Sequence, residues 1–114
     1  MRAMRLALAA LVALLLAACS QPLPQDKLAY AGSWRGTGMT LDISTGGEVR
    51  YRRVKGNSTT SVDAPIKVFH GDDFEVGIGP LTTRFVVSKP PTLDGGHWTM
   101  TVDGVVLSRP ATGA

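Results

Sequence analysis

The chain has 114 residues, of which 44% are hydrophobic, and a formal net charge of +3. Two of its basic residues, Arg2 and Arg5, lie in an apolar N-terminal segment, so residues 19–114 hold ten Lys and Arg against nine Asp and Glu. This balance lacks the strong, local basic surface on which nucleic-acid binding depends, and we expect no nucleic-acid partner. The length suffices for one small domain.

The first eighteen residues have the three zones of an export signal. Arg2 and Arg5 supply positive charge, and thirteen residues without a polar side chain follow from Leu6 to Ala18. An apolar run of this length suits a signal peptide and falls short of the roughly 20 residues that a spanning helix needs. The alternative, a buried helix of a cytosolic domain, would show polar residues at helical spacing, and this run has none. The sequence therefore predicts a signal peptide over residues 1–18.

The apolar run ends in Leu16, Ala17, Ala18 and Cys19. An aliphatic residue, two small residues and a cysteine in this order resemble the lipobox of bacterial lipoproteins. The resemblance implies cleavage between Ala18 and Cys19, a diacylglyceryl thioether on Cys19, and an acyl group such as palmitate on the new amino terminus. It also implies a lipid anchor in the cell envelope. By analogy with Gram-negative lipoproteins, Ser20 favours the outer membrane, with the domain facing the periplasm.

Residues 19–29 are expected to form a flexible, lipid-anchored tether. They include Pro22 and Pro24 and few side chains that could pack. Because roughly ten extended residues reach over 30 Å, such a tether would hold the domain clear of the lipid headgroups. Cys19 is the only cysteine, so the domain has no internal disulfide and depends on its core.

Residues 30–110 alternate short apolar and polar runs with glycine and proline breaks, and show no sustained helical periodicity. Strands are predicted over residues 39–44, 49–52, 62–69, 74–78, 82–88, 98–102 and 105–109. Asp103-Gly104 is the strongest hairpin signal, because tight primed turns favour these residue types. With short connections throughout, we expect an all-β fold: a small antiparallel meander of about seven strands, curled into a barrel or half-barrel. Residues 111–114 are expected to be a disordered tail.

The most conspicuous charged cluster is Arg50, Arg52, Arg53 and Lys55. If Tyr51 faces the core, Arg50 and Arg52 face solvent, and strict alternation turns Arg53 inward and Val54 outward. A bulge near Arg52 or Arg53 would return Val54 to the core, and we favour it over a buried arginine. An inward Arg53 would instead be a hook for a carboxylate or phosphate. The outward arginines would deter edge pairing, or contact an anionic lipid or another envelope polymer.

Tyr30, Trp34 and Trp98 lie near the two ends of the domain, where the first and last strands of a closed meander would meet. Core packing accounts for them, because large aromatic side chains are usually mostly buried. A solvent-facing pair would instead stack on sugar rings or a peptide. Trp34 and Trp98 are therefore candidate contacts of a ligand or partner, together with the three arginines.

No pattern in the chain is typical of catalysis. His70, Asp72 and Asp73 flank Gly71 as in a turn, and neither a zinc spacing nor a calcium loop is present, so we expect no metal and no cofactor. There is no Gly-x-Ser-x-Gly elbow, and lipid would occupy the thiol of Cys19. We therefore do not expect an enzyme.

Gly32, Ser33 and Trp34, followed by a meander, resemble the Gly-x-Trp start of lipocalin-type barrels, which implies an apolar pocket. The sequence thus favours a noncatalytic envelope lipoprotein whose domain binds a small apolar ligand or an envelope protein. One alternative is that the domain inhibits an envelope hydrolase. Small β-barrel lipoproteins that resemble inhibitors of lysozyme or of proteases act in this way. Another is a structural or assembly accessory of the outer membrane.

Overall fold

The computed structural model describes residues 21–110. The predicted signal peptide, the cleavage site at Ala18, the lipid-bearing Cys19 and the tail over residues 111–114 lie outside the described residues. Within 21–110, no helix is long and apolar enough to cross a membrane.

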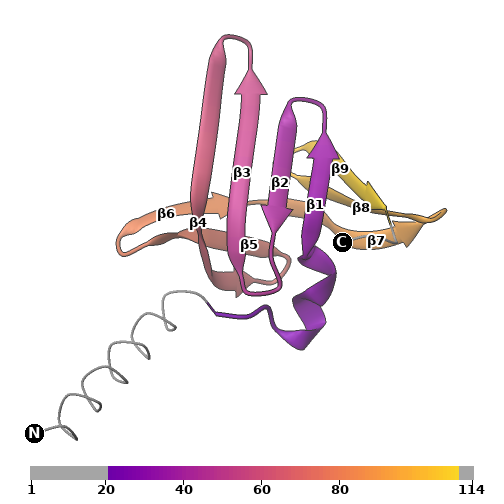
Figure 1. Ribbon diagram of the computed structural model, residues 1–114, viewed down its shortest axis with the longest axis horizontal. Helices are drawn as coiled ribbons and strands as arrows, with labels where there is room; N and C mark the ends of the chain where they lie inside the picture. The colour runs from indigo at the N-terminus through magenta and orange to yellow at the C-terminus, as the bar shows by residue number, and fades with distance from the viewer. Residues whose placement is uncertain (1–20, 111–114) are drawn as a thin grey trace, which may run out of the picture.

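Residues 21–110 form one antiparallel sheet of nine strands, preceded by a short 3-10 helix (Figure 1). The elements are η1 (Gln25–Tyr30), β1 (Gly32–Gly36), β2 (Met39–Ile43), β3 (Glu48–Lys55), β4 (Ser58–His70), β5 (Asp73–Ile78), β6 (Leu81–Phe85), β7 (Val87–Asp94), β8 (His97–Val102) and β9 (Val105–Pro110). Their order in the sheet is β6-β5-β4-β3-β2-β1-β9-β8-β7, so consecutive strands are neighbours except β6 and β7, and β1 additionally pairs with β9. The predicted all-β meander, curled into a half-barrel, is confirmed.

The sheet has nine strands where about seven were expected. β1 was not predicted because it contains two glycines and buries only Trp34 of its five residues. The single strand predicted over residues 82–88 is two strands, β6 and β7, and β7 continues through Pro90 and Pro91. Prolines are tolerated there because β7 is an edge strand, and its pairing with β8 shifts register between Lys89 and Thr92. The hairpin at Asp103-Gly104 is confirmed, since both residues have positive φ and Val102 pairs with Val105.

β6 and β7 are the two edges of the sheet, yet only Val86 separates them in sequence. Figure 1 shows this stretch passing behind β1, β2 and β3 as a second layer. Two carboxylates hold the bend: the Val87 N–H donates to Asp73 Oδ1 at 2.7 Å, and the Val86 N–H donates to Asp103 Oδ1 at 2.9 Å. These bonds satisfy backbone groups where the chain leaves one ladder and joins another.

The core lies between the layers and is filled by the protein's own side chains. Those with almost no exposed surface are Trp34, Phe74, Phe85, Met39, Leu41, Met100, Leu107, Val76 and Val102. Phe85 is central among the aromatic rings, with centroid distances of 5.1 Å to Phe74 and 4.8 Å to Tyr51. Burial of each large apolar side chain contributes about 1.5–3 kcal/mol relative to an exposed one. Because the chain has a single cysteine, packing of this core, rather than a disulfide, stabilises the domain.

The segment expected to be a tether packs on the domain over its described part. Leu23 is buried, and its N–H donates to the Thr45 carbonyl oxygen at 2.9 Å. Within η1, Tyr30 is buried and its hydroxyl donates to the Asp72 carbonyl oxygen at 2.8 Å. Burial, reinforced by the nearby acidic groups, raises the pKa of Tyr30 to about 12. Leu23, which lies in the segment expected to be a tether, therefore belongs to the buried core cluster.

Candidate functional site

The outer face of β1–β4 carries a row of polar side chains that runs across the strands. Trp34, Leu41 and Tyr51 take the inner face, so the residues next to them in sequence point outward. The register places Ser33 opposite Asp42, Asp42 opposite Arg50, and Arg50 opposite Asp63. An acidic, a basic and an acidic side chain therefore follow one another across three neighbouring strands.

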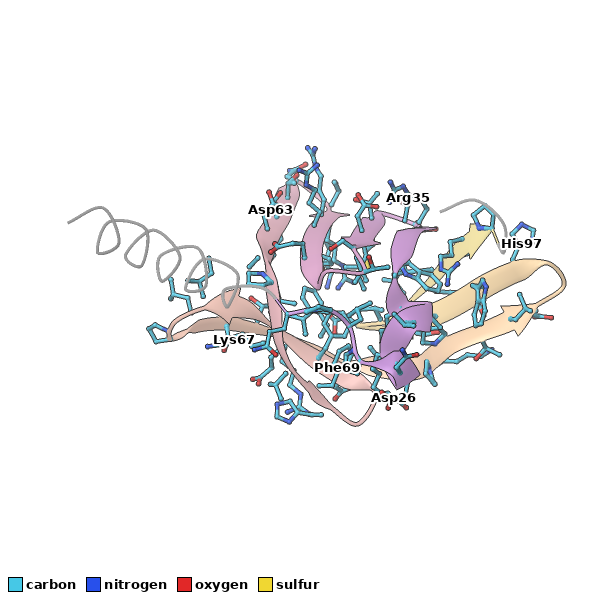
Figure 2. All side chains as sticks on the ribbon, turned by 60° about the horizontal axis from the view of Figure 1, so that its bottom comes forward. Asp26, Arg35, Asp63, Lys67, Phe69 and His97 are labelled. Carbon is cyan, nitrogen blue, oxygen red and sulfur yellow. The ribbon has the colours of Figure 1, made fainter. Side chains whose placement is uncertain are left out.

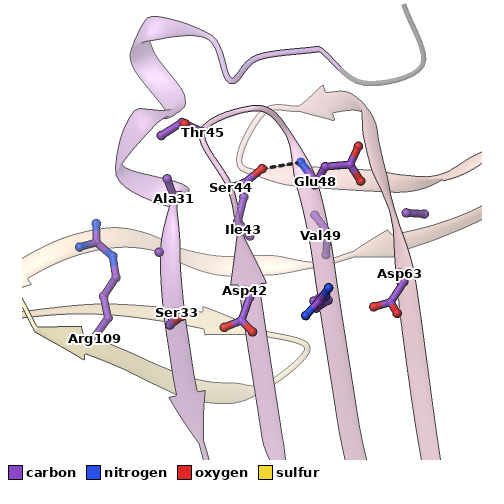
Figure 3. A pocket seen from close by; sticks show the side chains of 13 residues that line it. Ala31, Ser33, Asp42, Ile43, Ser44, Thr45, Glu48, Val49, Asp63 and Arg109 are labelled. Atoms are coloured by element: carbon purple, nitrogen blue, oxygen red, sulfur yellow. Dashed lines mark hydrogen bonds between the residues drawn. The ribbon is translucent and has the colours of Figure 1, made fainter. Parts of the chain in front are cut away.

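An open groove of about 1030 Å³ lies over this row. Figure 3 shows Ser33 on β1, Asp42 on β2, Val49 on β3 and Asp63 on β4 along it, with Arg109 at one end. Figure 2 shows Asp63 and Arg35 on the side of the sheet that faces away from Phe69. We call this the outer groove. Its lining residues are Ala31, Gly32, Ser33, Asp42, Ile43, Ser44, Thr45, Glu48, Val49, Arg50, Asp63, Ala64 and Arg109.

Asp42 is the one carboxylate of this row with an ion-pair partner among the described residues, since Arg35 Nη1 lies 2.8 Å from Asp42 Oδ1. Partial burial raises the pKa of the Asp42 carboxyl, but hydrogen bonds from Arg35 and Ser33 and the charges of Arg35 and Arg50 outweigh burial. The net effect holds the pKa below its ordinary value. Asp42 is therefore a fixed negative charge at neutral pH, whereas Arg50 and Asp63 make no ion pair within residues 21–110.

Arg109 closes one end of the groove and is held between two aromatic rings. Its guanidinium carbon lies 4.8 Å from the Trp34 ring centroid and 5.1 Å from that of Trp98, and Nη2 donates to the Ala29 carbonyl oxygen at 2.9 Å. Burial lowers the pKa of Arg109. A Cβ on Gly32 would lie 2.7 Å from Arg109 Cδ, so the glycine of the Gly-x-Trp triplet makes room for this stack.

The two tryptophans lie near the pairing of β1 with β9, and each of them contacts Arg109. Trp34 has no exposed surface, and its indole N–H donates to the Tyr30 carbonyl oxygen at 2.8 Å, so it cannot stack on a ligand. Trp98 is half-buried, with Arg109 over its ring. The core interpretation therefore holds for Trp34, and Trp98 has a structural contact with Arg109.

The bulge predicted near Arg52 or Arg53 is wrong. β3 pairs with β4 without interruption from Glu48 to Lys55, so Arg53 lies half-buried opposite Met39, and Val54 is 51% exposed. The reason is that β2 begins at Met39, so the β3–β4 hairpin overhangs its neighbour and no core exists at Val54 to favour a bulge. Arg50 and Arg52 point outward, as predicted.

The predicted contact residues therefore do not form one site. Arg50 lies in the outer groove, Arg52 follows it on the same face, and Arg53 lies on the opposite face, whereas the tryptophans surround Arg109. Asp42, Asp63 and Arg109 were not among the contact residues predicted from the sequence. The signal for Asp42 was present, because a turn at Thr45–Glu48 fixes the register that places Asp42 opposite Arg50.

A second open groove, of about 520 Å³, adjoins the first at Glu48, Asp63 and Ala64. It is lined further by Gln21, Pro65, Ile66, Lys67, Gly77, Ile78 and Gly79. Like the outer groove, it opens to solvent rather than into the core. Neither of these grooves is the interior apolar pocket that the lipocalin resemblance implies.

The predicted turn at His70-Gly71-Asp72-Asp73 joins β4 to β5, with Gly71 at a φ of +63°. His70 Nε2 lies 2.8 Å from Glu75 Oε2, and Arg84 Nη2 lies 3.1 Å from Asp73 Oδ2. Over the part of the chain that the structure describes, no group of three His, Cys, Asp or Glu side chains could hold a metal ion.

No protein-family model, curated protein or solved structure matches the chain. We therefore base the functional proposal on the sequence of the N-terminal segment and on the geometry of the described residues.

Proposed function

We propose that the chain is a lipid-anchored protein of the bacterial cell envelope whose β-domain binds an envelope protein through the outer groove, without catalysing a reaction. The signal peptide over residues 1–18 and the cysteine at the end of its apolar run support the anchor. Ala18 and Cys19 would flank the cleavage site, and Cys19 would bear the lipids. Ser20 favours the outer membrane, on its periplasmic side.

The observation that carries the binding proposal is the row Asp42, Arg50 and Asp63 on the outer face. Exposed charges contribute little to stability, typically about 0–1 kcal/mol for a pair, so the fold does not require this row. Paired strands hold the backbone of the three residues at fixed spacing, so no backbone has to become ordered on binding. A segment of the partner with alternating charge, opposite in sign to the row, would match it.

The interior of the half-barrel supports surface recognition rather than a small apolar ligand. Trp34, Met100 and Leu107 fill the space beside β1 and β9, and Phe74 and Phe85 fill the space beside β5 and β6. Close packing of this kind leaves no room for a ligand of drug-like size without movement of strands. The partner is therefore placed on the outside of the sheet in our proposal.

The anchor is tested by Cys19→Ala in a bacterium fed a radiolabelled or clickable palmitate. We expect the variant to accumulate as an uncleaved precursor without label, because the thiol that accepts the lipid is gone. Ser20→Ala serves as the matched control and should be cleaved and labelled. A Cys19→Ala protein that is still cleaved and still requires detergent for extraction would contradict the anchor.

The groove is tested by a charge swap in the full lipidated chain. Arg50→Asp combined with Asp63→Arg keeps opposite charges between β3 and β4 but changes the order of charges across β2, β3 and β4 from acidic, basic, acidic to acidic, acidic, basic. With a photo-crosslinking residue at Ser33, we expect a saturable adduct with an envelope protein that the swap reduces at least tenfold. The melting temperature should fall only slightly, because like charges then face each other on the exposed surface of β2 and β3. Lys89→Glu, an exposed charge change on β7, is the control. An adduct that survives the swap would exclude this face as the binding site.

A second candidate function, inhibition of an envelope hydrolase, is favoured by the overhang of the β3–β4 hairpin. Residues 54–59 extend past the start of β2 and are exposed, with Lys55 beside the tip and Arg52 below it. Such a projecting basic hairpin fits the cleft of an enzyme with acidic catalytic groups. Lysozyme turnover measured with the purified protein tests this, and an inhibitory hairpin should lose its effect in Lys55→Glu. Unchanged turnover at excess protein would exclude lysozyme as the target.

A further inference from the structure

The β5–β6 hairpin presents the most exposed apolar pair in the described chain. Its tip is a two-residue turn, Gly79-Pro80, with Ile78 and Leu81 directly opposite each other across it. Leu81 is 79% exposed and Ile78 69%, although both are large aliphatic side chains. Water disfavours such a pair, so an apolar or interfacial environment would suit this tip better.

The tip has a rigid shape. Gly79 adopts a φ of +59°, and proline fixes the next φ, which together suit the primed turns of tight hairpins. A Cβ on Gly77 would lie 2.0 Å from the Leu81 carbonyl oxygen, so the glycine allows the two strands to approach closely below the tip. The ammonium of Lys67 on β4 donates to the Gly79 carbonyl oxygen. Ile78 and Leu81 are therefore presented on a preformed support with a positive charge beside it.

This tip lies at the same end of the molecule as the start of the described chain. Gln21 lines the second groove together with Ile78, Gly79 and Lys67 (Figure 2 labels Lys67). The Gln21 backbone approaches Gly47, whose carbonyl oxygen accepts a hydrogen bond from Ile66 N–H on β4 at 2.8 Å. Gln21 follows Cys19 by two residues, and two residues span at most about 7 Å. Lipids on Cys19 would thus enter a bilayer beside this hairpin.

We propose that the Ile78–Leu81 tip inserts into the phospholipid bilayer next to the lipid anchor and so fixes the orientation of the domain on the membrane. This inference rests on the proposed anchor at Cys19. Lys67 would contact lipid phosphates beside the inserted tip. With the tip at the bilayer, the chain from Gln21 leads directly from the membrane to the sheet, which agrees with the packing of Leu23 on the domain.

Single introduced cysteines test the insertion in the full lipidated protein. Because the thioether would occupy Cys19, a new cysteine offers the one free thiol for an NBD fluorophore. We place it at Leu81→Cys and, as matched control, at Val106→Cys, which replaces a 63% exposed valine on β9. The protein is reconstituted in vesicles of phosphatidylethanolamine and phosphatidylglycerol, with or without brominated acyl chains.

For NBD at Leu81→Cys on vesicles, we expect the emission maximum to lie at a shorter wavelength than in detergent-free buffer. Brominated acyl chains should quench this emission several-fold. For NBD at Val106→Cys we expect neither the shift nor the quenching. Adding Ile78→Ser should reduce the shift at Leu81→Cys, whereas adding Val54→Ser should not. Vesicle flotation of the same samples separates the two proposals. A protein that floats but reports water at Leu81→Cys overturns the insertion and leaves the anchor intact, and equal signals at both positions overturn it as well. A protein that does not float overturns both.

Discussion

Two hairpins extend from the sheet, and their tips differ in chemistry. The β3–β4 hairpin ends in Lys55, Gly56 and Asn57, all exposed and polar or small, whereas the β5–β6 hairpin ends in Ile78 and Leu81. Neither tip packs against the core, so stability of the fold does not dictate either composition. The composition of each tip is therefore best explained by what surrounds it: the polar β3–β4 tip suits water and a polar partner, and the apolar β5–β6 tip suits lipid.

The largest loss of stability is expected when the glycine below the β5–β6 tip is replaced. Gly77→Ala should lower the free energy of unfolding by about 3 kcal/mol, because its Cβ would meet the Leu81 backbone, which cannot move without breaking the β5–β6 ladder. Urea denaturation of the lipidated protein in detergent measures this loss.

Gly56→Ala is the matched control in the β3–β4 hairpin. Its φ of +61° is unfavourable for alanine, but no atom lies within 4 Å of the added Cβ, so a loss of about 1 kcal/mol is expected. Equal losses in the two variants would show that the β5–β6 hairpin is no more tightly built than the β3–β4 hairpin.

A smaller effect should appear in acid at the base of the β5–β6 hairpin. The hydrogen bond from Val87 N–H and that from Arg84 lower the pKa of Asp73 from its ordinary 3.8. A lowered folded-state pKa means that the carboxylate stabilises the fold above about pH 4 and that this contribution is lost as the pH falls through the folded-state value. Asp73→Asn should therefore flatten the decline in stability below pH 4.

Hydrogen exchange locates this acid effect. In the protein without substitutions, hydrogen exchange at the Val87 amide should become faster relative to core amides as Asp73 is protonated. The reason is that protonation weakens Asp73 Oδ1 as the acceptor of the Val87 N–H. Asp42 also has a lowered pKa, but it lies on the outer face of β2, so Asp42→Asn should leave exchange at Val87 unchanged. Acid-induced exchange that spreads equally to the β3–β4 hairpin would remove the contrast between the two hairpins.

The smallest effect on stability is expected at the tips themselves. Leu81→Ser and Val54→Ser should each change the free energy of unfolding by less than about 0.5 kcal/mol, since both side chains are exposed. On vesicles they should differ: the amides around Leu81 should be protected from exchange in the unmodified protein and lose that protection in Leu81→Ser. Val54→Ser should leave exchange in both hairpins unchanged. Protection that persists in Leu81→Ser would contradict lipid contact at this tip.

The sequence was most informative where alternation and turn chemistry agreed. Met39, Leu41 and Ile43 are buried on one face of β2, as their spacing predicts, and Asp103-Gly104 forms its hairpin. The prediction failed at residues whose burial depends on neighbours that are distant in the sequence. Val54 faces solvent because its neighbouring strand has ended, and Leu23 is held against the core by its bond to the distant β2–β3 turn at Thr45. Neither circumstance can be read from adjacent residues.

The candidate site shows the same division. That Arg50 faces outward follows from alternation within β3, but its position between Asp42 and Asp63 depends on two registers. The register between β2 and β3 could be derived from the turn at Thr45–Glu48. The β3–β4 turn falls at Gly56-Asn57, a pair typical of two-residue hairpins, but the next strand was predicted to begin only at residue 62, so Asp63 was not aligned with Arg50. Arg109 on Trp34 joins residues 75 positions apart, which no local pattern specifies.

The pairing of β1 with β9 has a consequence for the way the chain reaches its native state. Every other pairing in the described sheet joins consecutive strands, so those ladders can grow hairpin by hairpin with short loop closures. β1 and β9 instead meet only after the intervening chain has been arranged, and their register brings Arg35 opposite Ser108. Refolding should therefore end in a slow docking step, visible when Arg109 settles over Trp34 and changes the fluorescence of the indole.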